Sequence, residues 1–287
     1  MPGRVITRAY LGGTVVLAFL LLTFGFTPGI LFSAEPEQLL GILGEAQELF
    51  QAASNSEDPE TARMLYQRSL DRFQRILEEG GVRNGKLFYN IGNTYFQIGE
   101  IGKAILFYRR AEILDPGDGN LRHNLSYVRS RRADRLPSNQ VSAAARILLF
   151  WHFLLSPKAK AYGFVSLFFL ACVLGAMALL RRKRTEIILL SIAGSLSLLL
   201  LGSLIADELR LRTFRDGVIT TKEVVARKGD GTAYQHSFID PLHEGTEFSL
   251  LEERKGWYRI RLTDGRTGWI PEAAGELVLW DRNPMKF

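Results

Sequence analysis

Apolar and polar residues follow different periods along the chain, and each change of period marks a new segment. Two runs, residues 161–180 and 187–206, each contain twenty residues without a charged side chain. An α-helix rises about 1.5 Å per residue, so each run matches a hydrocarbon layer about 30 Å thick. Residues 181–186 leave room only for a tight connection. The pattern therefore predicts a two-helix transmembrane hairpin over residues 161–206.

The N-terminal segment has the layout of a secretory signal. Arg4 and Arg8 precede an apolar stretch, and the small residues Ser33 and Ala34 follow it. Residues 1–34 are therefore predicted to be a signal peptide or, because Phe32 occupies a position that prefers a small residue, an uncleaved signal anchor. Both alternatives send the following segment across the membrane.

Residues 36–135 show helical spacing throughout, and the pattern is sharpest between Lys86 and Pro116. Two bursts of apolar and small residues are separated at Gly99. Their key positions are Phe88, Ile91, Gly92 and Tyr95, then Ala104, Tyr108 and Ala111. This pattern resembles the tetratricopeptide repeat, which implies pairs of antiparallel helices. Weaker matches on either side predict about two repeats and a capping helix, fewer than the usual three units. We therefore expect this domain to rest on a partner or on another part of the chain.

Residues 136–157 are predicted to form a linker and an interfacial helix. The apolar run Ile147–Leu155 is rich in aromatic residues and interrupted by His152. It is too short to cross a bilayer, which needs about 20 residues, so it is expected to lie on the membrane surface. The alternative is a helix packed against one of the folded domains.

The period changes to two in residues 214–280, as expected for half-buried strands. Tyr258, Ile260 and Leu262 alternate with arginines, and Asp264-Gly265 supplies a hairpin turn. With the pairs Gly256-Trp257 and Gly268-Trp269, this segment resembles bacterial SH3-like (SH3b) domains, although its first loop, Arg227 to Asp230, departs from the family's Arg-Ser-Gly-Pro. The resemblance implies an all-β SH3-like barrel. The predicted fold class is thus a multidomain membrane protein with an all-α repeat domain, a transmembrane hairpin and a C-terminal barrel.

The connection between the two apolar runs is strongly basic and sets the expected topology. It carries Arg181, Arg182, Lys183 and Arg184. Short loops rich in Lys and Arg stay in the cytoplasm. Both folded domains are therefore predicted to be extracytoplasmic, and the resemblance to bacterial families implies that this side is the periplasmic side of a bacterial inner (cytoplasmic) membrane. Cys172 is the only cysteine, so these domains must fold without an intrachain disulfide.

Residues for catalysis or for metal binding are not grouped in the sequence. The four histidines are scattered, and no catalytic or metal-binding motif occurs. The formal net charge of +6 is spread over several segments, which does not favour nucleic-acid binding. We expect a protein without enzyme activity, cofactor or metal.

Two surfaces are candidate binding sites. In a tetratricopeptide repeat the first helix of each pair lines a concave groove, and amides and aromatics there suit an extended peptide. The predicted groove residues are Lys86, Tyr89, Asn90, Asn93, Gln97, His123, Asn124 and Tyr127. The alternative is that Asn90 and Asn93 only form hydrogen bonds between helices. On the predicted barrel, an exposed aromatic strip is expected from Tyr234, Trp257, Tyr258 and Trp269, with Trp257 and Trp269 in the core as the alternative.

The order of these segments resembles that of the BatE proteins of bacterial aerotolerance operons. The resemblance rests on NIGNTYFQIG, the following helix, the apolar hairpin and GW…DGRTGW. It implies a non-enzymatic scaffold in an aerotolerance or envelope stress complex, with membrane von Willebrand factor A-domain proteins and a MoxR-type ATPase as partners, beside membrane lipid. The alternatives are a membrane anchor or sensor that binds peptidoglycan through the SH3b domain, and an accessory module of an envelope enzyme.

Overall fold

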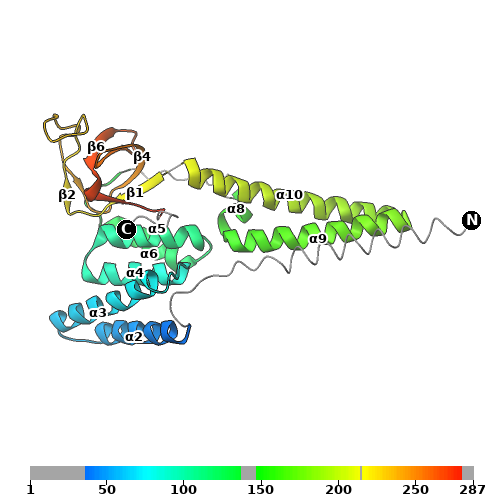
Figure 1. Ribbon diagram of the computed structural model, residues 1–287, viewed down its shortest axis with the longest axis horizontal. Helices are drawn as coiled ribbons and strands as arrows, with labels where there is room; N and C mark the ends of the chain where they lie inside the picture. Colours follow the sequence, from blue (N-terminus) through cyan, green and yellow to red (C-terminus); the bar gives the residue numbers. More distant parts are fainter. Residues whose placement is uncertain (1–35, 137–146, 214, 280–287) are drawn as a thin grey trace, which may run out of the picture. The chain divides into compact units, whose positions relative to one another are not determined.

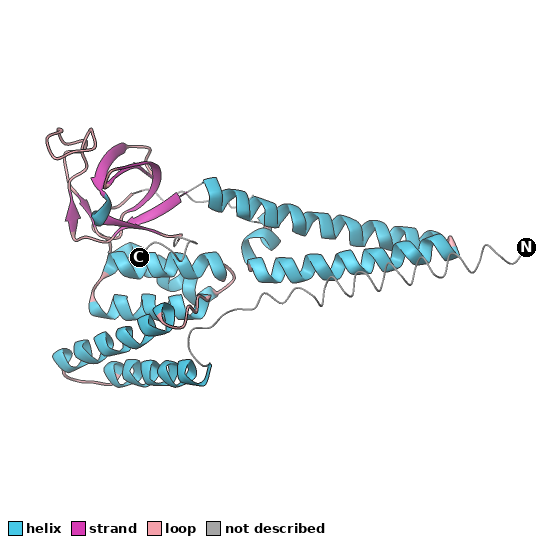
Figure 2. Cartoon of the chain, viewed as in Figure 1, coloured by secondary structure: helices cyan, strands magenta, loops and turns pink. Residues whose placement is uncertain are grey.

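The computed structural model describes residues 36–136, 147–213 and 215–279 (Figure 1). These residues divide into two compact units: one contains residues 163–199, and the other contains all the remaining described residues. Helices form the described chain before residue 214, and nearly all the regular structure after it consists of strands (Figure 2). The predicted signal segment, residues 1–34, lies outside the described residues.

Five helices form the N-terminal domain, here called the repeat domain. They are α2 (Pro36–Ser54), α3 (Pro59–Glu78), α4 (Gly85–Ile98), α5 (Ile101–Leu114) and α6 (Gly119–Arg131). Side chains that accept backbone hydrogen bonds begin three of them: Asp58 at α3, Asn84 at α4 and Asp118 at α6. Such caps satisfy amide groups that have no partner within the helix. Gly99 ends α4 with a left-handed φ of 90°, a conformation that glycine adopts without steric cost.

The small positions of the repeat pattern allow the paired helices to approach closely. A Cβ atom at Gly92 would lie 2.7 Å from the ring of Tyr108, so only glycine fits between α4 and α5. In the preceding pair, the hydroxyl of Ser69 on α3 donates to the carbonyl of Ala46 on α2 at 2.8 Å. Phe88 and Phe107 fill the space between α4 and α5, with ring centroids 5.9 Å apart. The helical repeat architecture predicted from the sequence is therefore confirmed.

An antiparallel sheet dominates residues 215–279, here called the sheet domain. Its strands are β1 (Arg215–Ile219), β4 (Glu247–Arg254), β5 (Trp257–Leu262), β6 (Thr267–Pro271) and β7 (Gly275–Leu277), in the order β6-β5-β4-β1-β7. A short pair, β2 (Glu223–Val224) and β3 (Leu242–His243), and the 3-10 turn η1 (Glu272–Ala274) complete it. The β5–β6 hairpin turns at Gly265, with a φ of 89°. The antiparallel sheet is confirmed, whereas closure into an SH3-like barrel stays a prediction.

The outer face of α5 packs directly on the sheet domain. A Cβ atom at Gly102 would lie 2.5 Å from the carbonyl oxygen of Ile219, which shows how closely α5 approaches the end of β1. Val218 and Val278 are fully buried and belong to the apolar core of the repeat domain. The short array therefore rests on another part of the same chain, one of the two arrangements expected from its length.

A cluster of charged residues surrounds this apolar contact. Glu247 on β4 accepts hydrogen bonds from Arg129 at 2.7 and 3.0 Å and lies 3.6 Å from the Nε atom of Arg109. Arg109 also reaches Asp216 on β1 at 3.3 Å. Burial raises the pKa of Glu247, but Arg129 and Arg109, with Arg132, more than offset this and hold the pKa below its usual value. Glu247 is therefore the ionised centre of the interface.

A second polar contact fixes the chain where it leaves α6. Asp134 accepts from the backbone amide of His243 at 2.7 Å and from the hydroxyl of Thr246 at 2.5 Å. Burial opposes ionisation of Asp134, yet these hydrogen bonds lower its pKa below the usual value. The end of the repeat domain is thereby tied to the turn before β4.

Two long helices, α9 (Pro157–Arg181) and α10 (Arg184–Thr213), carry the apolar runs. Both are long and apolar enough to cross a membrane, by length and composition. The connection is shorter than the predicted residues 181–186. The amide of Arg182 still bonds the carbonyl of Ala178, and α10 already begins at Arg184. Only Arg182, with a φ of 51°, and Lys183 lie between the helices.

The segment before α9 contains the short helix α8 (Phe150–Leu154). It occupies the C-terminal part of the predicted linker and interfacial helix, residues 136–157, of which residues 137–146 lie outside the described residues.

The close approach of α5 to the sheet predicts a sharp difference between two glycines in helices. Gly102→Ala is expected to lower the free energy of unfolding by about 1–3 kcal/mol, because the methyl group meets the Ile219 carbonyl. Gly41→Ala, on an open face of α2, is expected to leave it unchanged or to raise it by up to about 1 kcal/mol through helix propensity. Calorimetric unfolding of the full chain in detergent measures both, and equal effects would contradict the close contact.

Ionisation of Glu247 predicts a dependence of the interface on acid. A carboxyl group whose pKa is lowered by folding stabilises the protein above its unfolded-state pKa, and this contribution is lost as the pH falls through the folded-state value. Glu247→Gln is therefore expected to cost about 3 kcal/mol at pH 7, because it leaves the half-buried guanidinium group of Arg129 without its charged partner. The difference from wild type should shrink below the usual glutamate pKa of 4.5.

Melting temperatures of wild type and Glu247→Gln between pH 3 and 7 test this prediction. Glu276→Gln is the matched control, because Glu276 is half exposed and lies 3.4 Å from a single arginine, Arg110. A constant difference between wild type and Glu247→Gln across this range would contradict an ionised centre at Glu247.

Candidate functional site

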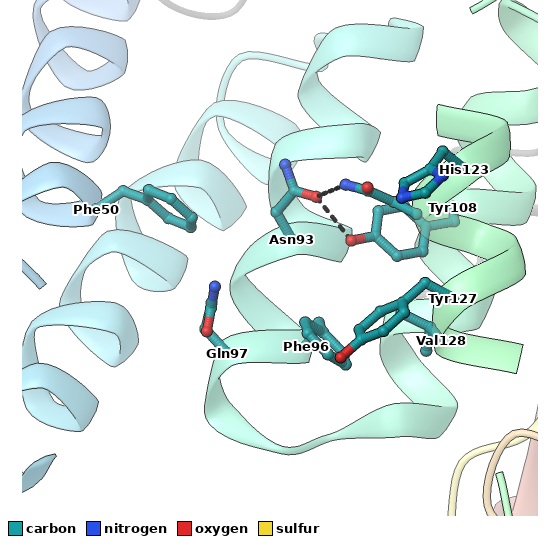
Figure 3. Close-up of a pocket in the computed structure, with 9 residues that line it drawn as sticks. Phe50, Asn93, Phe96, Gln97, Tyr108, His123, Tyr127 and Val128 are labelled. Atoms are coloured by element: carbon teal, nitrogen blue, oxygen red, sulfur yellow. Dashed lines mark hydrogen bonds between the residues drawn. The ribbon is translucent and has the colours of Figure 1, made fainter. Parts of the chain in front are cut away.

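A pocket of about 430 Å³ opens on the concave face of the repeat domain (Figure 3). Helices α4 and α6 supply most of its wall, and α2 and α5 each supply one residue. The lining residues are Phe50, Asn93, Phe96, Gln97, Tyr108, His123, Asn124, Tyr127 and Val128.

Helical spacing brings these side chains onto one face. Asn93, Phe96 and Gln97 are separated by three and four residues on α4, so they share a face of that helix. His123 and Tyr127 are related in the same way on α6. The capping helix therefore extends the groove as a first helix of a further repeat would.

The wall of the pocket combines aromatic rings with side-chain amides. Phe96 meets Tyr127 edge-on with ring centroids 5.7 Å apart, and the two rings lie side by side in Figure 3. Phe50 on α2 packs edge-on against Tyr66, at 5.1 Å. Tyr127 remains 43% exposed and carries the guanidinium group of Arg131, which donates to its hydroxyl at 2.6 Å. Such a surface can cover an apolar side chain while the amides bond a peptide backbone.

A hydrogen-bond network lies beneath this surface. The hydroxyl of Tyr108 donates to the side-chain oxygen of Asn93 at 2.6 Å, and the amide of Asn124 donates to the same oxygen at 3.1 Å (Figure 3). Asn124 also donates to the hydroxyl of Tyr89 at 2.9 Å. Burial raises the pKa of Tyr108 well above its usual value, so its hydroxyl stays protonated and remains a donor. The network joins α4, α5 and α6.

The structure brings together part of the predicted groove. Asn93, Gln97, His123, Asn124 and Tyr127 line the pocket, and their binding role stays a prediction. The side-chain oxygen of Asn93 is already used in contacts between helices, which was the alternative considered for this residue.

Lys86, Tyr89 and Asn90 do not line the pocket. Lys86 is exposed in the first turn of α4, whereas Tyr89 is half-buried against Tyr108, with ring centroids 5.9 Å apart. Asn90 lies half-buried, one turn before Asn93 and Thr94.

Sequence reasoning missed four lining residues. Phe96 and Val128 follow groove positions at helical spacing and could have been found from the period alone. The sequence pattern assigned Tyr108 only to the contact between α4 and α5, but its side chain also lines the pocket. Phe50 depends on how α2 is placed against α4, which no local pattern in its sequence reveals.

The predicted aromatic strip on the sheet domain needs correction. Tyr258 is 7% exposed and Trp269 is 8% exposed, so neither contributes to an open aromatic surface. Tyr258 points into the sheet core because alternate residues of β5 face inward. Trp269 is covered by the guanidinium group of Arg254, 5.3 Å from its ring centroid. Tyr234 is exposed and Trp257 is half-buried, and a binding role for them stays a prediction.

Among the residues that the structure describes, no three or more His, Cys, Asp or Glu side chains are grouped so that they could hold a metal ion.

Comparison with known proteins identifies one segment of the chain. Residues 51–112 match the tetratricopeptide repeat family model, a span that runs from the end of α2 to near the end of α5. No curated protein matches the chain. Repeats of this kind stack helix pairs into concave surfaces that bind other proteins, so the match supports a scaffold for protein–protein interaction.

The network predicts that loss of the Asn93 side chain lowers the unfolding free energy more than loss of the Tyr108 hydroxyl. Asn93→Ala is expected to cost about 1–3 kcal/mol of unfolding free energy, because the buried hydroxyl of Tyr108 loses its acceptor. Tyr108→Phe is expected to cost less, about 0.5–1.5 kcal/mol, since Asn93 keeps the bond from Asn124. Asn90→Ala is the control, as the side chain of Asn90 makes no hydrogen bond to another described residue. Denaturant unfolding measures the three variants, and an effect of Asn93→Ala no larger than that of Asn90→Ala would contradict the network.

Proposed function

We propose that this chain is a non-enzymatic, membrane-anchored scaffold that binds an extended segment of a protein partner in the pocket of its repeat domain. The observation that carries the proposal is that the two faces of the repeat domain have different surroundings. The sheet domain covers the outer face of α5, while the concave face keeps an open pocket.

The chemistry of the pocket favours a peptide with a large apolar side chain. Phe50, Phe96 and Tyr127 offer aromatic surface, and the exposed amide of Gln97 lies at the rim. A strongly charged ligand would have no oppositely charged side chain on the lining to meet it.

Membrane anchoring is supported by α9 and α10, which form the proposed hairpin. A hairpin that crosses the membrane twice returns the chain to its original side. The direct contacts of Arg109 and Arg129 with Glu247 support the proposal that the repeat and sheet domains lie in one compartment. Arg181 to Arg184 at the connection support a cytoplasmic turn, and hence periplasmic domains.

The partner class follows from the resemblance to BatE proteins. The repeat, the apolar pair of helices and the antiparallel sheet occur in the order that this resemblance implies. We therefore propose membrane von Willebrand factor A-domain proteins, linked to a MoxR-type ATPase, as partners in an aerotolerance or envelope stress complex. The sheet domain is proposed to be an SH3-like barrel. The second candidate is peptidoglycan binding by that domain, which the exposed side chain of Tyr234 favours.

Selection of peptides on the full chain in lipid nanodiscs tests the pocket. Displayed random peptides are expected to converge on sequences with a large apolar residue. Tyr127→Ala should weaken the selected peptides at least tenfold, about 1.4 kcal/mol, by removing the exposed ring beside Phe96. Gln67→Ala, at an exposed position on α3 away from the pocket, is the matched control and should have no effect. Peptide affinities that are insensitive to Tyr127→Ala would overturn the proposed site.

A parallel measurement separates the second candidate. Sedimentation of the same nanodiscs with purified peptidoglycan, lost on Tyr234→Ala but kept on Tyr127→Ala, would favour the cell-wall anchor over the peptide scaffold.

A further inference from the structure

Four polar side chains meet where α8, α9 and α10 come together. The ammonium group of Lys160 on α9 lies 2.5 Å from the carboxylate of Asp207 on α10. His152 on α8 shares a hydrogen bond with Ser203 on α10 at 2.8 Å, and its Nε2 atom lies 3.7 Å from Asp207. These residues are called the base cluster.

The base cluster marks the end of the apolar helices. Lys160 directly precedes the uncharged run of α9, and Asp207 directly follows that of α10. The Lys160 side chain is only 2% exposed, and burying a charge this fully is unfavourable unless a partner neutralises it. The ion pair therefore holds the open ends of the two helices together at the level where their apolar length ends.

The segment of residues 147–154, here called the α8 segment, is held at this level from two sides. His152 ties it to α10 through Ser203. On the other side, a Cβ atom at Gly117 would lie 2.6 Å from the carbonyl oxygen of Leu154, so the turn between α5 and α6 rests on its backbone. The α8 segment is thus fixed between the repeat domain and the ends of α9 and α10.

Large apolar side chains of the α8 segment nevertheless point outward. Their exposed fractions are 75% for Ile147, 71% for Leu148, 60% for Phe150 and 47% for Leu154. Nearby, Lys158 on α9 and Arg210 on α10 are also exposed. An apolar strip with flanking cations is the composition that suits the interface of a bilayer with anionic headgroups.

We propose that the α8 segment is inserted in the interfacial layer of the lipid bilayer and holds the repeat domain against the membrane surface. The proposal rests on the hairpin of the proposed function and goes beyond it, because an anchor alone leaves the distance of the pocket from the membrane open. Lipid is favoured as the occupant by continuity: α9 begins at Pro157, three residues after the end of α8. A pocket held in this way suits partner segments that run close to a membrane surface.

Site-directed spin labelling of the full chain in nanodiscs with anionic lipid tests the proposal. Cys172→Ser removes the single native cysteine. Single cysteines then replace Phe150, Leu198 on α10 and Leu40 on α2, which are all exposed in this structure. Accessibility to oxygen, which partitions into lipid, and to a water-soluble nickel chelate reports the depth of each nitroxide. We expect the nitroxide at position 198 to lie deep in the bilayer, the one at position 40 to lie in water, and the one at position 150 to lie at an intermediate depth.

The outcomes distinguish this inference from the proposed function. An aqueous reading at position 198 would overturn the spanning hairpin. A deep reading at 198 with an aqueous reading at 150 would overturn the interfacial α8 segment and leave the hairpin intact. Shielding of position 150 from both reagents would also overturn it, in favour of a protein surface or a second copy of the chain as the occupant.

A variant of the base cluster provides an independent check. His152→Ala, in the Phe150→Cys background, removes the bond to Ser203 and is expected to increase nitroxide mobility and to shift position 150 toward the aqueous reading. His152→Gln keeps a hydrogen-bonding side chain and should retain more of the interfacial reading, which separates loss of this bond from general unfolding. An unchanged depth in His152→Ala would contradict the role of the base cluster in holding the α8 segment.

Discussion

The packing of α5 on β1 is the contact on which the rest of the structure depends. Two helix pairs and a capping helix bury too little apolar surface to form a stable domain by themselves, since stacked arrays usually need about three repeats. The sheet domain supplies the missing surface through Val218 and Val278. Glu247 is tolerated at the rim of this contact because Arg109 and Arg129 meet its charge. Apolar burial thus provides the stabilisation, and the ion pairs determine how the two domains are aligned.

This arrangement leaves the concave face of the repeat domain available. Because the sheet packs on the outer face of α5, it does not cover the pocket between α2, α4 and α6. The bonds from Tyr108 and Asn124 to Asn93 keep its floor in one conformation before any ligand arrives. A preformed wall reduces the entropy lost on binding. In the proposed scaffold role, the outer face of α5 packs against the sheet domain and the concave face of the repeat domain binds a partner.

Periodicity was sufficient to predict the elements but not their mutual contacts. Gly92, Gly99 and Tyr108 revealed the helix pair because each has a local steric reason, and the alternation of Tyr258, Ile260 and Leu262 revealed a strand. The same alternation should have placed Tyr258 in the core rather than on the predicted strip.

Contacts between distant residues left no comparable local signal. The pairing of Glu247 with Arg129, and the place of Phe50 in the pocket, depend on how whole elements are arranged. The burial of Glu247 and its contact with Arg129 depend on the assembled fold, so neither could be predicted from the local pattern around these residues.

The approach of Gly102 to Ile219 also constrains the order in which the molecule can be made. The last helix of the repeat domain ends at Arg131, but the strands that cover α5 are complete only at Leu277. At a usual synthesis rate of about 5–20 residues per second, the outer face of α5 stays uncovered for roughly 10–30 seconds. During that interval the apolar runs of α9 and α10 emerge and, in the proposed topology, enter the bilayer. Docking of the two domains is then the closing step of biogenesis, and it can take place only in chains whose hairpin has been inserted correctly.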